Sequence, residues 1–188
     1  MEFISDRVSV ERQGEGISIV IGSRLPKRQW ALLIGWLVAW TLCGVAFLYE
    51  FLHGAGPDMR VPLFIMLAFW GYFELRIIRV VLWRKKGFEL LRVKDGELTI
   101  KNSLYRFGKA TRYFIANIQR LGLLNMDETS WKWQMSDSFW TRGAERLGFE
   151  YHEKKVAFGR GLTEEEAREV VQLLAAELKR ERKAERKS

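Results

Sequence analysis

Two long apolar segments limit what this chain can fold into. Residues 30–52 carry one charged side chain, Glu50, and residues 61–73 carry none. At 1.5 Å per residue, a helix over Trp30 to Leu48 crosses the roughly 30 Å of bilayer hydrocarbon. We therefore expect a first transmembrane helix over about 30–52.

The second apolar segment crosses only if its charged inner half is included. It continues as ELRIIRVVLW, which contains Glu74, Arg76 and Arg79. Arginine side chains can extend toward the headgroups, and Trp30 and Trp83 are suited to the same interface. We expect a second span over about 61–83. The short Gly- and Pro-containing link makes residues 29–86 an antiparallel transmembrane hairpin.

Basic residues flank this hairpin on one side. Arg24, Lys27 and Arg28 precede it, Arg84, Lys85 and Lys86 follow it, and Arg60 alone lies between the spans. The positive-inside rule then predicts a two-pass protein of the inner (cytoplasmic) membrane with both termini in the cytoplasm. A signal peptide is not expected, because the first apolar segment starts late and a second span follows it.

The composition argues against several classes of function. A single cysteine, Cys43, forms no internal disulfide, and two histidines, His53 and His152, are too few for a His-based metal site. No nucleotide-binding, hydrolase or metalloprotease motif is present. We expect a protein that is not an enzyme, with no cofactor and no nucleic-acid partner. The net charge of +8 suits the inner leaflet.

Alternating residues predict strands on both sides of the hairpin. Residues 1–28 read as an N-terminal β-hairpin that joins the cytoplasmic domain. Asp95-Gly96 is a strong two-residue hairpin turn, and residues 110–124 are rich in strand formers. The stretch 131–135 alternates as a strand, and residues 147–159 predict a hairpin closing through His152 to Lys155. The expected inward face of the first hairpin is Val8, Val10, Ile17, Ile19 and Ile21.

The last predicted element is an amphipathic helix. Thr163 is the expected N-cap, with Glu166 completing a capping box. One face is apolar and must pack on the strands. We expect the basic tail, residues 179–188, to fray because it has no such face. The apolar face comprises Ala167, Val170, Val171, Leu174 and Leu178.

The two spans are followed in order by FELLRVKDGELTIKN, a strand ending in IANIQRL, and FGRGLTEEEAREVVQLLAAEL. In this order the segments resemble the bacterial pleckstrin-homology-like (PH-like) membrane proteins. The resemblance covers residues 87–178. It implies two small antiparallel sheets, packed nearly orthogonally and closed by a C-terminal helix. The fold class expected is therefore an α+β membrane protein: a transmembrane hairpin with a cytoplasmic PH-like β domain.

Glu74 is an ionisable residue deep in the second span. Such a group usually has a partner, which would lie on the first helix, such as Thr41, or on another protein. It could serve a proton or ion relay, or it could lock helix packing or assembly. The second reading is favoured, because a relay generally needs several such groups in series.

Aromatic residues supply further candidate contacts. Trp36, Trp40, Cys43 and Phe47 share one stripe of the first helix, which could dock a partner helix or face lipid. In the domain, Trp131 and Trp133 alternate as core residues do, whereas Phe139 and Trp140 are candidates for an exposed contact. The helix-docking candidates are Trp36, Trp40, Phe47 and Glu74.

Basic residues of the domain could contact lipid or another anion. Arg160 lies in a Gly159-Arg160-Gly161 sequence before the last helix, which could hold an anion or could be only a tight turn, the reading we favour. The full set of candidates is Arg84, Lys85, Lys86, Arg106, Lys109, Arg112 and Arg160.

Three functional hypotheses remain. The leading one is a non-catalytic accessory or scaffolding subunit of a larger membrane protein complex, with membrane lipids and other membrane subunits as partners. The second is an anionic-lipid-sensing module that uses Arg106, Lys109 and Arg112. The third is a small transporter or proton-conducting element that uses Glu74.

Overall fold

A computed structural model describes residues 2–14, 16–54, 56–105, 107–124 and 140–185. The chain forms two compact units. Residues 1–24 and 83–188 make one unit, and residues 25–82 make the other. The first is an α+β domain with antiparallel sheets, and the second is a pair of helices.

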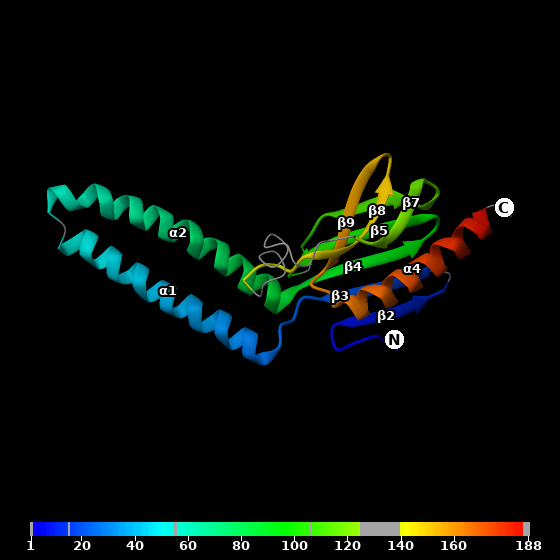
Figure 1. Cartoon of the computed structure of the whole chain (residues 1–188), viewed down its shortest axis with the longest axis horizontal. Helices are drawn as coiled ribbons and strands as arrows, with labels where there is room; N and C mark the ends of the chain where they lie inside the picture. Colours follow the sequence, from blue (N-terminus) through cyan, green and yellow to red (C-terminus); the bar gives the residue numbers. More distant parts are fainter. Residues whose placement is uncertain (1, 15, 55, 106, 125–139, 186–188) are drawn as a thin grey trace. The chain divides into compact units, whose positions relative to one another are not determined.

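The helical unit consists of two antiparallel helices joined by a short turn (Figure 1). Helix α1 spans Lys27–His53 and helix α2 spans Pro57–Lys86, so the last turn of α2 belongs to the other unit. Both helices are long and apolar enough to cross a membrane. They include the two spans expected from the sequence.

The larger sheet of the domain is a meander in which each strand pairs with the next. Its strands are β1 (Glu2–Phe3), β2 (Val8–Gln13), β3 (Gly16–Gly22), β4 (Gly87–Lys94), β5 (Glu97–Leu104) and β6 (Ala110–Phe114). The smaller sheet contains β7 (Ile118–Leu123), β8 (Glu145–Tyr151) and β9 (Lys154–Arg160) in that order.

Strands β3 and β4 pair although the whole helical hairpin separates them in the chain. Ile19 lies opposite Leu91 in this antiparallel register. The residues before the first helix therefore join the sheet that continues after the second, as the sequence predicts. The predicted inward face is confirmed, because Val8, Val10, Ile17, Ile19 and Ile21 are all buried.

Two tight turns close hairpins where they are expected. Asp95 and Gly96 both have positive φ, at 53° and 72°, and join β4 to β5. His152 and Glu153 also have positive φ and join β8 to β9. The second turn is shorter than predicted, since Lys154 and Lys155 already pair with β8.

One predicted strand is in fact two. Residues 110–124 were expected to run as a strand, but a 3₁₀ helix, η1 (Ile115–Asn117), interrupts them and passes the chain from one sheet to the other. The physical reason is that Ile115 and Ile118 are both fully or nearly buried. A continuous strand cannot direct both residues into one core, because residues three apart lie on opposite faces.

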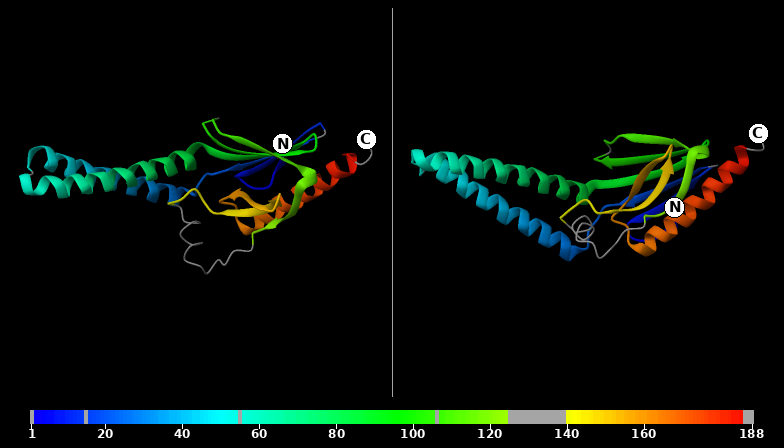
Figure 2. Two further views of the ribbon diagram at one scale, coloured as in Figure 1. Left: turned by 90° about the horizontal axis from the view of Figure 1, so that it is seen from above. Right: turned by 45° about the horizontal axis from the view of Figure 1, so that its top comes forward.

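Helix α4 (Glu164–Glu185) lies across the domain and contacts β4, η1, β7 and β8 (Figures 1 and 2). Its predicted apolar face is confirmed: Ala167, Val170, Leu174 and Leu178 are buried and Val171 packs against the same core. On the sheets, Tyr113 of β6 meets Phe149 and Tyr151 of β8 edge to face. A single core therefore joins both sheets and the helix.

The expectation that the tail frays after Leu178 is wrong for its first seven residues. Helix α4 continues to Glu185. The Glu181 carboxylate accepts a hydrogen bond from the Gly96 N–H, and the Arg182 guanidinium donates to the carbonyls of Ile115 and Ile118. These polar contacts hold a segment that has no apolar face. The predicted strand at 131–135 lies outside the described residues.

Candidate functional site

Two tryptophans join the helices of the hairpin. The Trp70 indole N–H donates to the carbonyl of Trp40 at 2.9 Å, and the Trp40 indole N–H lies 3.5 Å from the carbonyl of Trp70. Each ring thus reaches across to the backbone of the opposite helix. In a bilayer, such bonds satisfy polar groups that have no water to bind.

A glycine makes room for this exchange. A Cβ atom built on Gly44 would lie 1.9 Å from Cε2 of the Trp70 ring, well inside contact distance. Gly44 is buried, although it lies in a helix whose outer residues are exposed. Small residues allow helices to approach closely in membranes, and here the glycine admits an aromatic ring.

Glu74 lies beside these rings and accepts a hydrogen bond across the hairpin. The Thr41 hydroxyl is 2.8 Å from Glu74 Oε1 and also 2.8 Å from the Leu37 carbonyl of its own helix. The predicted partner for Glu74 on the first helix is therefore confirmed. Glu74 is 9% exposed, and its Oε2 has no hydrogen-bond partner within the described part of the chain.

No hydrogen bond or ion pair joins Glu74 to a second ionisable side chain among the described residues. A relay generally passes through several such groups. The observed contact with Thr41 is the kind that fixes the packing of two helices.

The remaining residues of the aromatic stripe divide between two surroundings. Trp40 faces α2, whereas Trp36 is 47% exposed and stacks on Trp40 with ring centroids 6.1 Å apart. Cys43 is exposed and Phe47 is half-buried. The hairpin's own second helix therefore occupies part of the predicted docking stripe, and Trp36 remains on its outer surface.

The outer surface of the hairpin is almost wholly apolar along the middle of both helices. Its exposed large side chains include Leu32, Trp36, Val38, Leu42, Val45, Leu48, Phe64, Ile65, Met66, Phe69, Tyr72 and Leu75. The polar contacts between Trp40, Thr41, Trp70 and Glu74 are directed inward. This distribution is the reverse of that in a water-soluble helix pair.

The predicted lipid contacts at the end of α2 need one correction. Arg84 is 4% exposed, and its Nε donates to the Thr141 carbonyl at 2.9 Å. A buried guanidinium cannot reach a headgroup, so Arg84 holds the domain together instead. Lys85 and Lys86 are exposed. Trp83, predicted at the membrane interface, is also buried in the domain, with the Arg142 guanidinium 5.7 Å from its ring centroid.

The other basic candidates lie in different places. Lys109 and Arg112 are exposed on and beside β6, and Arg112 lies 3.8 Å from Glu97. The Arg160 guanidinium forms a close ion pair with Glu145, with Nη2 to Oε1 at 2.6 Å. Arg160 is therefore engaged within the domain. Arg106 lies outside the described residues.

The backbone N–H groups of the Gly159-Arg160 turn do bind a carboxyl group, and that group belongs to the chain itself. Glu89 of β4 accepts hydrogen bonds on Oε2 from the backbone N–H groups of Gly159 at 2.8 Å and Arg160 at 3.1 Å. Burial raises the pKa of Glu89, although these two N–H groups and the Arg160 charge oppose the rise. The sequence favours a tight turn at this position, and nothing near Glu89 in the sequence indicates that its carboxyl group fills the turn.

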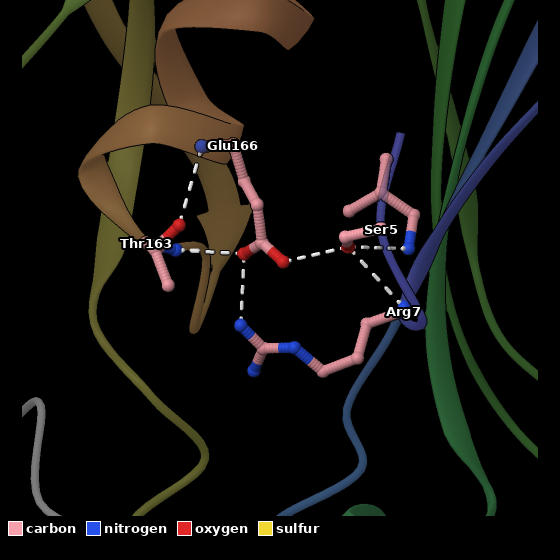
Figure 3. A network of polar contacts seen from close by, with 5 residues as sticks. Ser5, Arg7, Thr163 and Glu166 are labelled. Atoms are coloured by element: carbon pink, nitrogen blue, oxygen red, sulfur yellow. Dashed lines mark hydrogen bonds and ion pairs between the residues drawn. The ribbon is translucent and has the colours of Figure 1, made fainter. Parts of the chain in front are cut away.

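A second carboxylate links the N-terminal residues to α4 (Figure 3). Glu166 completes the predicted capping box, with its Oε2 accepting from the Thr163 N–H at 2.8 Å and its own N–H donating to Thr163 Oγ1 at 3.2 Å. It also accepts from the Ser5 hydroxyl at 2.7 Å and pairs with Arg7 at 2.8 Å. Burial would raise the pKa of Glu166, but the hydrogen bonds from Ser5 and Thr163 and the Arg7 charge together lower it.

The exposed aromatic candidates are only partly described. Trp140 is 39% exposed. Phe139, Trp131 and Trp133 lie outside the described residues. Across the residues that the structure describes, no group of three His, Cys, Asp or Glu side chains is arranged to hold a metal ion.

Comparison with known proteins adds no further assignment. No protein-family model matches the chain, and no curated protein matches it.

Proposed function

We propose that this chain is a non-catalytic, two-pass protein of the inner membrane that acts as an accessory or scaffolding subunit of a larger membrane protein complex. The observation that carries the proposal is the inverted polarity of the hairpin. Its polar groups, Trp40, Thr41, Trp70 and Glu74, bind one another between the helices, and its outer surface is apolar. Only lipid or other apolar helices can cover such a surface without a large free-energy cost.

The distribution of basic residues supports cytoplasmic termini. Exposed Arg24, Lys27 and Arg28 lie at the start of α1, and exposed Lys85 and Lys86 lie at the end of α2. Arg76 and Arg79 are exposed in the same half of α2, close enough to that end for their side chains to extend toward headgroups. Both ends of the hairpin then face the side that retains positive charge.

The domain supports membership of the PH-like group. It has two antiparallel sheets followed by a C-terminal helix that packs on both of them. The N-terminal strands complete the larger sheet across the hairpin, so the hairpin is an insertion within the domain's sequence. The hairpin is therefore connected to the domain through two neighbouring strands of one sheet, β3 and β4.

A binding role is supported by the way in which the domain uses its charged groups. The domain's own side chains occupy the two places that could bind an anion. Glu89 fills the Gly159-Arg160 turn and Glu166 fills the start of α4. Arg160 is paired with Glu145. On the hairpin, Trp36 is a large aromatic side chain that stacks on Trp40 and is 47% exposed. Exposed aromatic residues are frequent anchors of protein contacts.

The test is extraction of the full chain from its native membrane with a mild detergent, followed by size analysis and identification of co-purifying proteins. We expect a complex larger than the free chain. Trp36→Leu should reduce the partner's recovery several-fold. Val45→Leu is the matched control, because Val45 is exposed on the same helix two and a half turns away, on the opposite side.

Two outcomes would contradict the proposal. A chain that runs only as a free monomer, with no co-purifying protein, removes the accessory role. A partner that is recovered equally well from the Trp36 and Val45 variants shows that this face of α1 does not bind it.

A further inference from the structure

The turn between β5 and β6 exposes aromatic side chains at the end of the sheet where α2 leads into β4. We propose that Tyr105, Phe107 and Lys109, here called the interfacial turn, insert into the headgroup region of the bilayer and bind anionic lipid there. The inference rests on the proposed membrane insertion of the hairpin. It assigns a second membrane contact to the domain itself.

Strand register places the interfacial turn level with the end of α2. Strand β4 starts at Gly87, immediately after the last residue of α2, and Gly87 pairs with Leu104 of β5. The Cα atoms of such antiparallel partners are about 5 Å apart. Strand β5 runs back toward α2, so Tyr105 continues past this pair. The Asp95-Gly96 turn closes the opposite end of the same two strands.

The depth of this position suits a headgroup contact. Gly87 lies five residues after Leu82, where the helical unit ends, which is about 7.5 Å along a helix. The polar region of each leaflet is about 5–7 Å thick, as half the difference between the whole bilayer and its hydrocarbon core. Side chains close to Gly87 are therefore near enough along the chain to extend to the headgroups.

The side chains of the interfacial turn have the chemistry of an interfacial anchor. Leu104 and Phe107 exchange backbone hydrogen bonds of 2.8 and 3.0 Å, which close the turn. Phe107 is 83% exposed and Tyr105 is half-exposed. Aromatic side chains concentrate at membrane interfaces, and exposed apolar side chains that lie close together mark contact surfaces more than single ones do.

The backbone conformation adds a second observation. Tyr105 has φ 51°, in the left-handed region that Gly, Asn and Asp adopt most readily. The turn at the opposite end of the same strands uses Asp95 and Gly96. An aromatic residue at Tyr105 is therefore not explained by closure of the hairpin, and a contact for its ring is an explanation.

Charge favours lipid over a protein as the occupant of this surface. Exposed Lys85, Lys86 and Lys109 lie at this end, whereas at the other end Lys94 lies 3.4 Å from Asp95 and opposite Glu97. Each basic residue near an anionic leaflet adds attraction. A protein partner would also cover the aromatic side chains, and the experiment below distinguishes it.

The experiment uses the full chain in liposomes with a fluorophore at a single cysteine. Cys43→Ser removes the native thiol, and Phe107→Cys, Lys94→Cys and Leu42→Cys each introduce one. Lys94 is the matched control, because it is exposed at the opposite end of the same strands. Leu42, exposed in the middle of α1, reports whether the hairpin is inserted. Quenchers are lipids spin-labelled in the headgroup or in the acyl chain.

We expect headgroup quenching at position 107 to exceed that at position 94 several-fold. Lys109→Ala should reduce it in phosphatidylglycerol-containing liposomes and leave it unchanged in pure phosphatidylcholine. Equal headgroup quenching at positions 107 and 94 overturns the inference. If the label at position 42 is quenched from the acyl chain in the same experiment, the hairpin is still inserted. A turn that is covered by a protein would give this same result. An unquenched label at 42 overturns the proposed insertion as well. No effect of Lys109→Ala in either lipid overturns the anionic-lipid contact. Circular dichroism verifies that each variant is folded.

Discussion

The Thr41 hydroxyl lies 2.8 Å from Glu74 Oε1, on opposite helices of the hairpin. The residues are 33 positions apart, and each lies in a segment that is otherwise apolar. Their contact, together with the Trp40 and Trp70 exchange, sets which faces of α1 and α2 meet. The two helices of the hairpin therefore pack against each other through specific side-chain contacts.

Removing the Thr41 hydroxyl should weaken the hairpin. We expect Thr41→Val to lower the hairpin's free energy of unfolding by about 0.5–2 kcal/mol, the range for hydrogen bonds between membrane helices. Unfolding of the full chain from mild detergent by added denaturing detergent measures this. Thr41→Ser keeps the hydroxyl and should retain most of the stability. Equal loss in the Val and Ser variants would show that the bond contributes nothing.

Adding a methyl group at Gly44 should force the helices apart. Gly44→Ala places a carbon 1.9 Å from the Trp70 ring, so the ring or a helix must move. Overpacking of this kind costs about 1–3 kcal/mol. The same detergent titration measures it. The control is Gly35→Ala on the same helix, where an added Cβ meets no atom within 4 Å. Replacing Trp70 with Leu should relieve the Gly44→Ala defect, and a failure to do so contradicts this packing.

The contact between Glu89 and the Gly159-Arg160 turn should make stability depend on pH. Burial raises the folded-state pKa of Glu89 above its ordinary value of 4.5. The stability associated with this raised pKa is present below pH 4.5 and is lost as the pH rises through the folded-state pKa. Glu89→Gln keeps an acceptor oxygen without the charge. Its stability relative to the unchanged chain should increase as the pH rises above 4.5.

Thermal unfolding of the full chain in detergent, followed at several pH values, tests this prediction. Glu89→Ala is the contrasting variant, since it leaves two backbone N–H groups without an acceptor and should cost about 1–3 kcal/mol for each such group. A constant difference between the Gln variant and the unchanged chain at all pH values would contradict the buried, raised carboxyl.

Glu166 should show the opposite dependence. Its folded-state pKa is lowered below 4.5, so its contribution is present above pH 4.5 and is lost as the pH falls through the folded-state value. Glu166→Gln should be less stable at neutral pH by about 1 kcal/mol, because hydrogen bonds to a charged group contribute more than those to a neutral one. Its deficit should shrink on acidification. Arg7→Gln, which removes only the ion pair, should show a smaller deficit. A deficit independent of pH would contradict the lowered pKa.

Much of the local structure could be predicted from the sequence. Alternation placed Val8, Val10 and Ile19 inward, Asp95-Gly96 specified its turn, and Thr163 with Glu166 specified a helix start. Each signal depends on residues only a few positions apart. The contact between Thr41 and Glu74 was also foreseen, because an isolated polar group in an apolar helix restricts its own choice of partner.

Long-range contacts could not be predicted in this way. Nothing near Arg84 in the sequence indicates that its guanidinium is buried against Thr141, and nothing near Glu89 indicates the turn that it fills. The helical tail at Glu181 and Arg182 is held by groups far away in the chain.

The sequence alone therefore determined the two apolar helices, the strands and turns, and the covering helix, because periodicity and turn chemistry act over short distances. Tertiary structure alone decided which charged groups are available to a partner. Arg84, Glu89, Arg160 and Glu166 bind other groups within the domain. The charged side chains of Lys85, Lys86 and Lys109 are exposed, as is the aromatic ring of Phe107. The physical reason is that a charged side chain is buried only where distant parts of the chain supply its hydrogen bonds.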